Sequence, residues 1–351
     1  MKCTAPNRSL GLPPLWAACF AWICLWGGGA RGAETRYAYE KAEMGLPVRV
    51  TLYAPDEPTA RAAADRAFAR VEALNAVFSD YDSDSELSRL SDTSGSGAAV
   101  PVGRELWRVL EFAQRVSALS RGAFDITVGP VVNLWRVARR KRALPGADRL
   151  QEALGRVGYA HLELDPAGRT ALLRKARMRL DAGGIAKGYA MEEALEVLRS
   201  GGFPRAMVAG GGDIALGDPP PGEPGWRIEV IALDAGGAPA PRFLRLSNCS
   251  VATSGDLYQR LEIDGKRYSH IVDPRTGIGL TDHSLVTVVA RRGLEADALS
   301  KVLAVLGPGE GLPIVEQFPD VAAYVVRAPE GRVEEHFSDR WKMLESRQLQ
   351  K

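Results

Sequence analysis

The order of helical and strand patterns along the chain limits its fold more than any other feature of the sequence. Apolar periodicity predicts helices over residues 58–79, 105–122, 148–158, 185–200 and 294–307. Short or alternating apolar runs predict strands over residues 47–54, 206–209, 226–233, 243–253, 267–273, 284–290, 321–327 and 332–338. The two kinds of element are interspersed without a regular strand–helix alternation. This order predicts an α+β fold, a single large domain with a mostly antiparallel sheet and packed helices.

The balance of charge gives no argument for a nucleic-acid partner. The 351 residues include 45 lysines and arginines against 43 aspartates and glutamates, for a formal net charge of +2. Hydrophobic residues make up 46% of the chain and charged residues 25%, which is ordinary for a globular protein. Because there is no basic excess, we expect no nucleic-acid partner.

The first 33 residues differ in character from the rest of the chain. Two basic residues precede an apolar segment over residues 15–26, and small residues follow it. This pattern is typical of a secretory signal peptide, so we expect residues 1–33 to direct export and residues 34–351 to form the domain. The alternative is an uncleaved membrane anchor, because the apolar run approaches the roughly 18 residues of a short membrane span.

Cysteine usage excludes an internal disulfide in the domain. Three of the four cysteines lie within the predicted leader, and Cys249 is the remaining one. A single thiol has no partner within the same chain. We expect Cys249 to be a small buried residue.

The stretch DAGGIAKGYA, residues 181–190, predicts an anion site. Asp181 is followed by glycines, and Lys187 falls in the first turn of the predicted helix. Exposed backbone N–H groups, the positive end of a helix and a lysine all favour a bound anion. The alternative is a tight packing junction, since glycine also serves where two backbones approach closely.

Two further segments combine small and polar residues. AGGGDIALG, residues 209–217, has three glycines after a strand and fits either a close approach of a ligand or a plain turn. Residues 253–256, which include Thr253 and Ser254, are predicted to form a polar loop. His270 follows them on a strand beside the turn DPRTG, where it is either a structural histidine or a general base.

Two charged features carry opposite expectations. Asp297 lies near the start of an otherwise apolar helix, where it either caps the helix or binds a hard cation. The basic run over residues 139–142 is predicted to be a solvated loop.

Taken in order, these segments resemble the FAD:protein FMN transferases, the ApbE-like family. The motifs are MGLPVRV (44–50), FSDYDSDSELSRL (78–90), FDITVGPVVNLW (124–135), LDAGGIAKGYA (180–190), AGGGDIALG (209–217), SVATSGDLY (250–258), HIVDPRTG (270–277) and ADALS (296–300). Each motif alone is weak, but the ordered set covers nearly all of residues 34–351 and is highly specific.

The resemblance implies an activity, a partner and a location. Members of the family move an FMN unit from FAD to a threonine or serine hydroxyl of a partner protein and release AMP. It implies Mg²⁺ as cofactor and, as partner, a flavin-bearing acceptor subunit that belongs to a membrane redox complex. Exported members are common, so we expect a periplasmic protein, with membrane anchoring as the alternative to cleavage.

The resemblance also implies roles for particular residues. His270 is the expected base, and Asp297 and the carbonyl of Gly184 are the expected metal ligands. Contacts to FAD are expected from Met44, Tyr81, Ala123, Phe124, Asp125, Asp181, Lys187, Thr253, Ser254 and Val272. Two other functions stay open: a pyrophosphatase that splits FAD into FMN and AMP, and a non-catalytic FAD-binding accessory protein.

One position departs from the family's pattern. Four residues after the metal-binding aspartate the family usually has a threonine that also binds the metal, and this chain has Lys301. Residues four apart share a helix face, so the ammonium group is expected near the cation site. It would either weaken Mg²⁺ binding or supply part of the charge of the metal.

Overall fold

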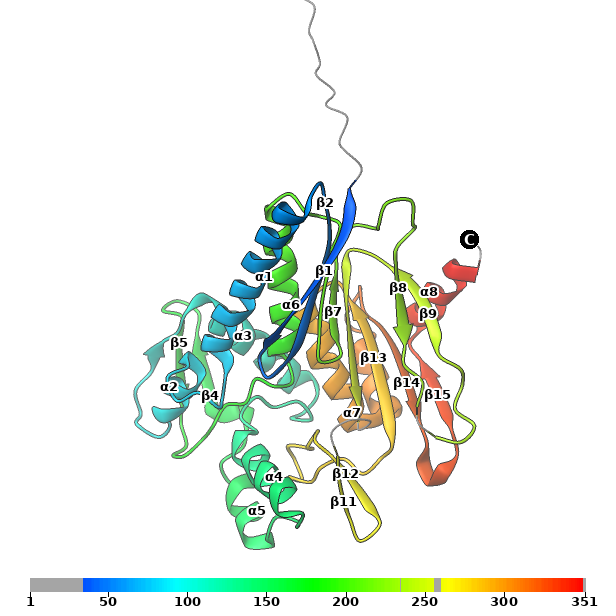
Figure 1. Ribbon diagram of the computed structural model, residues 1–351. Coiled ribbons are helices and arrows are strands. Elements are labelled where there is room, and N and C mark those ends of the chain that lie inside the picture. Colours follow the sequence, from blue (N-terminus) through cyan, green and yellow to red (C-terminus); the bar gives the residue numbers. More distant parts are fainter. Residues whose placement is uncertain (1–33, 234, 256–259, 350–351) are drawn as a thin grey trace, which may run out of the picture. The chain divides into compact units, whose positions relative to one another are not determined.

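One large antiparallel sheet runs through the fold (Figure 1), in a computed structural model that describes residues 34–233, 235–255 and 260–349. Its strands lie in the order β1 (Thr35–Glu43), β2 (Leu46–Ala54), β6 (Ala206–Gly210), β7 (Asp213–Leu216), β10 (Cys249–Gly255), β13 (Ser284–Ala290), β14 (Ala322–Arg327) and β15 (Glu334–Phe337). Every neighbouring pair in this sheet is antiparallel. The predicted α+β fold with a mostly antiparallel sheet is confirmed.

Helices and small sheets surround the large sheet. The helices are α1 (Glu57–Phe78), α2 (Glu86–Asp92), α3 (Arg104–Leu119), α4 (Gly129–Lys141), α5 (Ala147–Leu154), α6 (Ala186–Ser200), α7 (Gly293–Val315) and α8 (Asp339–Leu349), with short 3₁₀ turns η1 (Tyr159–His161) and η2 (Pro329–Gly331). The small sheets are formed by β3 (Val100–Pro101), β5 (Thr170–Leu173) and β4 (Leu162–Asp165), by β8 (Trp226–Val230) and β9 (Arg242–Leu246), and by β11 (Arg260–Ile263) and β12 (Lys266–Ser269).

Both faces of the large sheet are covered, and β13 shows this most clearly. All seven of its residues are buried. Val286 and Val288 belong to the main core, which is completed by apolar residues of α1, α3, α6 and α7. Leu285 and Val289 belong to a second core on the opposite face, which contains Trp341 of α8. A strand covered on both faces reads as a continuous apolar run, as SLVTVVA does.

The first turns of α6 and α7 cross at two glycines. A Cβ atom on Gly188 would lie 2.2 Å from the carbonyl oxygen of Gly293, and one on Gly293 would lie 2.0 Å from that of Gly188. Each helix also caps the other. Asp297 of α7 accepts a hydrogen bond from the Gly188 N–H at 3.0 Å, and Glu192 of α6 accepts one from the Gly293 N–H at 2.9 Å. Because carboxylates are stabilised at helix N-termini, this crossing fixes Asp297 beside the start of α6.

The close crossing makes Gly188 intolerant of a side chain. Gly188→Ala is expected to lower the free energy of unfolding by about 1–3 kcal/mol or more, because the new methyl group meets backbone atoms. Gly309→Ala is the matched control, since Gly309 is also helical but has no atom within 4 Å of the added Cβ position. The control is expected to be neutral or stabilising by up to about 1 kcal/mol. Urea unfolding measures both variants, and equal stabilities would contradict the crossing.

The basic run over residues 139–142 is not a loop, as predicted, but mostly the last turn of a helix. α4 continues through Lys141 because Val131, Trp135 and Ala138 keep an apolar face buried at helical spacing. Arg142 ends the helix in the left-handed region, with φ of 51° and ψ of 41°.

The predicted polar loop at Thr253 and Ser254 is also wrong, since both residues lie on β10. Thr253 pairs with Thr287 of β13 in the register of the sheet, and residue 256 lies outside the described residues. Cys249, expected to be buried, is half-buried at the start of β10. Polar residues continue this strand because the sheet supplies backbone partners on both sides.

Residues 34–351 cluster into one compact unit, and the predicted leader over residues 1–33 lies outside the described part of the chain. Within the described part, α7 is long and apolar enough to span a membrane by length and composition alone. It is interrupted at Gly307, whose φ of 67° and ψ of 179° are not helical. Leu299, Val302 and Leu303 of this helix lie in the main core, which is the position of a core helix.

Candidate active site

The turn at residues 181–187 has the acid, bare backbone and cation that its sequence predicted. Asp181 Oδ1 accepts a hydrogen bond from the Gly183 N–H at 2.8 Å, and Lys187 Nζ donates to the Gly183 carbonyl at 3.2 Å. A Cβ on Gly183 would lie 2.9 Å from Asp181 Oδ1, and one on Gly184 would lie 3.2 Å from Lys301 Cγ. The glycines are therefore places where polar groups pack closely against the backbone.

Two lysines and two buried aspartates meet beside this turn and form the central cluster of the site. Lys187 Nζ lies 3.2 Å from Asp213 Oδ2 and 3.5 Å from Asp297 Oδ2. Lys301 Nζ lies 2.5 Å from Asp297 Oδ1. Asp213 is 3% exposed and Asp297 is completely buried. Buried carboxylates require cations or hydrogen-bond donors, and here the two ammonium groups supply them.

The two aspartates of the cluster titrate very differently. Burial would raise the pKa of Asp297, but the ammonium groups of Lys187 and Lys301 outweigh it and lower the pKa to about 2. Burial, assisted by the charge of Asp297, raises the pKa of Asp213 to about 6. The pKa of Lys187 is raised, because Asp213 and Asp297 outweigh the effect of its burial. Asp297 is therefore ionised at neutral pH, whereas Asp213 titrates at a pH close to neutral.

Strand β10 adds a hydroxyl group to the cluster. Ser254 Oγ lies 2.7 Å from Lys301 Nζ and 2.7 Å from Ser300 Oγ. Ser300 in turn donates to the backbone carbonyl of Asp297 at 2.7 Å. The side chain of Thr253 is directed to the other face of the sheet, because successive residues of a strand alternate.

Arg136 connects the turn to the loop that follows α1. Its guanidinium donates to Asp80 and, at 3.2 Å, to Asp181 Oδ2. It also lies over the ring of Tyr81, 4.2 Å from the ring centre, and Tyr81 is 78% exposed. Burial and the charge of Asp80 raise the pKa of Asp181, against the opposite effect of Arg136. Tyr81 thus presents an open aromatic surface next to the glycine turn.

Ala123, Phe124 and Asp125 are all buried. Phe124 lies against the turn, with Cε2 3.3 Å from a Cβ position on Gly184. Asp125 accepts hydrogen bonds from the Thr127 N–H at 2.8 Å, the Thr127 hydroxyl at 2.7 Å and the Tyr159 N–H at 2.7 Å. Burial raises the pKa of Asp125, against the effect of these bonds. Its carboxylate is engaged in folding the loop, so its predicted contact with FAD stays a prediction.

The segment that carries His270 is held by α4. His270 is half-buried and follows β12 directly. Trp135 of α4 donates to the Gly277 carbonyl at 2.8 Å, and its ring lies 5.5 Å from that of Tyr268. The side chain of Val272 is packed into the same apolar cluster, so its predicted contact with FAD would come from its backbone.

Met44 lies in the tight turn between β1 and β2. Met44 and Gly45 have φ of 52° and 73°, which is typical of a two-residue hairpin turn. A Cβ on Gly211 would lie 2.8 Å from Leu46 Cδ2 and 3.6 Å from Lys187 Cδ. The hairpin that starts at Met44 therefore lies beside the lysine of the central cluster.

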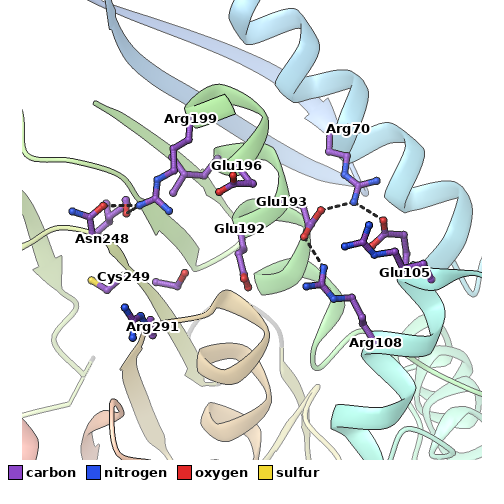
Figure 2. A pocket seen from close by; sticks show the side chains of 14 residues that line it. Arg70, Glu105, Arg108, Glu192, Glu193, Glu196, Arg199, Asn248, Cys249 and Arg291 are labelled. Atoms are coloured by element: carbon purple, nitrogen blue, oxygen red, sulfur yellow. Dashed lines mark hydrogen bonds and ion pairs between the residues drawn. The ribbon is translucent and has the colours of Figure 1, made fainter. Parts of the chain in front are cut away.

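A separate cavity of about 400 Å³ lies along the second half of α6 (Figure 2). Figure 2 shows Arg70 between Glu105 and Glu193, with Arg108 on the other side of Glu193. Cys249 lines this cavity, and burial raises its pKa to about 12. The paired charges connect α1, α3 and α6. The charged residues that line this cavity therefore form a structural network of ion pairs, separate from the central cluster.

Solved structures define the class of this fold. The flavinyl transferase ApbE of Pseudomonas stutzeri, in its apo form, superimposes with a TM-score of 0.78 and 29% identity, over 89% of this chain and 97% of that one. The flavin transferase ApbE of Vibrio cholerae superimposes with a TM-score of 0.78 and 28% identity, over 89% and 99% of the two chains. The fold is thus that of the flavin transferases.

The family follows from the sequence comparisons. Residues 44–325 match the model of the ApbE family. The FAD:protein FMN transferase of Haemophilus influenzae is 32% identical over 304 residues, 84% of this chain and 88% of that protein. That of Treponema pallidum is 32% identical over 358 residues, 94% and 98% of the two chains. The chain belongs to the ApbE family, and the resemblance seen in its motifs is confirmed.

Two residues of the site escaped the sequence analysis. Asp213 follows three glycines at the start of a strand, where an acid is unusual, and this was a usable signal. Arg136 precedes the basic run that was interpreted as a loop, so nothing in the sequence separated it from its solvated neighbours.

Proposed function

We propose that this chain transfers FMN from FAD to a threonine or serine hydroxyl of a partner protein and releases AMP. The observation that carries the proposal is the match to the ApbE family over residues 44–325, together with the joining of its separate motifs at one cluster. Lys187, Asp213 and Asp297 come from three elements and meet at the glycine turn. The relatives compared above are named as FAD:protein FMN transferases.

The reaction requires an in-line displacement at the FMN phosphorus. The acceptor oxygen forms a new bond to that phosphorus, and the bond to the bridging oxygen of the diphosphate breaks. AMP leaves with the bridging oxygen, and the hydroxyl proton passes to a base. His270 is the residue proposed for this proton, because histidine is the side chain that most often acts as a general base. The ammonium groups of the cluster are the proposed hydrogen-bond donors to the diphosphate oxygens.

Mg²⁺ remains a prediction from the resemblance, with Asp297 and the Gly184 carbonyl as its ligands. It would polarise phosphate oxygens when bound. The donor set of this chain fits it poorly. Asp297 Oδ1 already accepts from Lys301, and Oδ2 accepts from the Gly188 N–H. In the described residues no group of three histidine, cysteine or acidic side chains is arranged to hold a metal.

We further propose that the acceptor is a flavin-bearing subunit of a membrane redox complex and that the chain works in the periplasm after export. These proposals rest on the motifs and on the leader-like composition of residues 1–33. Assays with FAD in the absence and in the presence of an acceptor separate the alternatives to transfer. Free FMN without any acceptor would indicate a pyrophosphatase, and intact bound FAD with an acceptor present would indicate an accessory protein.

The raised pKa of Asp213 predicts a pH dependence of FAD binding. As the pH rises through about 6, Asp213 loses its proton and adds negative charge beside Lys187, so the affinity for FAD is expected to fall several-fold. Asp213→Asn keeps the shape of the side chain and is expected to remove this dependence. Flavin fluorescence titrations between about pH 5 and 7.5 measure both proteins. An unchanged slope in the variant would assign the dependence to another group.

A further inference from the structure

The Lys301 ammonium lies beside Asp297, the residue that the resemblance implies as a metal ligand. Its ammonium nitrogen lies 2.5 Å from Asp297 Oδ1, 2.7 Å from Ser254 Oγ and 3.3 Å from Ser300 Oγ. Three oxygens from two elements thus surround one cation. The side chain of Lys301 is only 15% exposed, and its carboxylate partner is completely buried.

The stem of Lys301 also fills the space in front of the glycine turn. Its Cγ atom lies 3.2 Å from the Cβ position of Gly184, the residue whose carbonyl would be the second metal ligand. The lysine therefore passes between that turn and Asp297. A divalent cation held by both groups would have to share this space with the lysine.

The charges of the cluster balance without any metal. Asp213 and Asp297 carry two negative charges when both are ionised, and Lys187 and Lys301 carry two positive ones. A divalent cation next to Asp297 would lie within a few ångströms of a fixed ammonium group, where like charges repel strongly in a buried site. With an uncharged residue at position 301, the same cluster would have a net charge of −1 and would repel a diphosphate.

We infer that the Lys301 ammonium replaces the divalent cation in this chain. The chain would then bind the diphosphate of FAD and transfer FMN without a metal. The part of this inference that concerns transfer rests on the proposed function. The parts that concern metal exclusion and FAD binding do not. Asp297 precedes Lys301 by four residues on α7, the orientation in which an acid and a base attract best along a helix. Lysine acts as a point charge on phosphate groups, which is the part of a metal's task that it can take over.

The test measures metal binding, FAD binding and transfer separately on the full chain. Mn²⁺ is titrated and followed by electron paramagnetic resonance, with and without FAD. FAD affinity is measured with and without EDTA. The wild-type chain is expected to show no saturable Mn²⁺ site at millimolar concentrations and an FAD affinity and transfer rate unchanged by EDTA.

Substitutions at position 301 sharpen the test. Lys301→Thr restores an oxygen ligand and removes the ammonium, so it is expected to gain an Mn²⁺ site and to need metal for FAD binding and transfer. Lys301→Met supplies neither charge nor ligand and is expected to lose about tenfold in FAD affinity, with no rescue by Mn²⁺. Lys342→Met, on the exposed face of α8, is the control and should leave all three readouts unchanged.

Two results would overturn the inference. One is stoichiometric Mn²⁺ binding by the wild-type chain, with loss of FAD binding in EDTA. The other is an Mn²⁺ affinity that is the same in the wild type and in Lys301→Thr. An absence of transfer in every protein, with FAD and Mn²⁺ binding as expected, would instead refute the proposed transferase function and leave the metal-free site supported.

Discussion

His270→Ala is expected to lower the rate of FMN transfer by a factor of about 10²–10⁴ while FAD stays bound, because positioned proton transfer contributes about that much to catalysis. The residue is half-buried directly after β12, on a segment fixed by the Trp135 hydrogen bond to Gly277. Removal of the imidazole leaves the Lys–Asp cluster intact. Single-turnover transfer and flavin fluorescence titration measure the two effects separately.

His336→Ala provides the control for this substitution. His336 lies on β15 at the edge of the large sheet and pairs with Glu334 at 3.5 Å. It is expected to leave transfer unchanged. Strong residual transfer by His270→Ala, or an equal loss in both variants, would remove His270 from the proposed mechanism.

Lys187→Met is expected to have the second largest effect, on stability and on ligand binding together. The variant leaves Asp297 paired with Lys301 and removes the lysine that lies beside Asp213. Removal of one partner from a buried ion cluster costs about 3 kcal/mol or more in the free energy of unfolding. The loss of a charged donor for the diphosphate is expected to weaken FAD binding by about 10- to 100-fold.

A double variant separates these two roles of Lys187. Asp213→Asn combined with Lys187→Met removes one positive and one negative charge, so urea unfolding should show part of the stability regained. FAD affinity should stay low, because no ammonium group returns. Full recovery of FAD binding in the double variant would show that Lys187 acts only on the stability of the fold.

The elements of this fold could be predicted from the sequence wherever one period dominates. The amphipathic pattern of α1 and the apolar run of β13 each identified their element. The end of α4 was missed because its basic residues are typical of a solvated loop, whereas its buried face continues in Trp135 and Ala138. At this end of α4 the local composition favours a loop, whereas the buried apolar face favours a helix. The burial determines the structure.

The sequence identified individual residues of the site but not the contacts between them. Asp181, Lys187 and Asp297 were identified individually, and the contact between Lys187 and Asp297 depends on the crossing of α6 and α7 at Gly188 and Gly293. Nothing in the local pattern shows which two helices cross. The contacts of Lys301 follow from the same crossing, because it brings α7 against the glycine turn that precedes α6.

Mass analysis of an acceptor protein after incubation with the chain and FAD is the decisive test of the proposed FMN transfer. The acceptor carries a target threonine of the flavinylation type, and a variant with valine at that position is its control. We expect the acceptor with threonine to gain one FMN unit on that residue, with one AMP released for each unit, and the valine variant to gain none. An unmodified acceptor, with FAD either intact or split into free FMN, would contradict the proposed function.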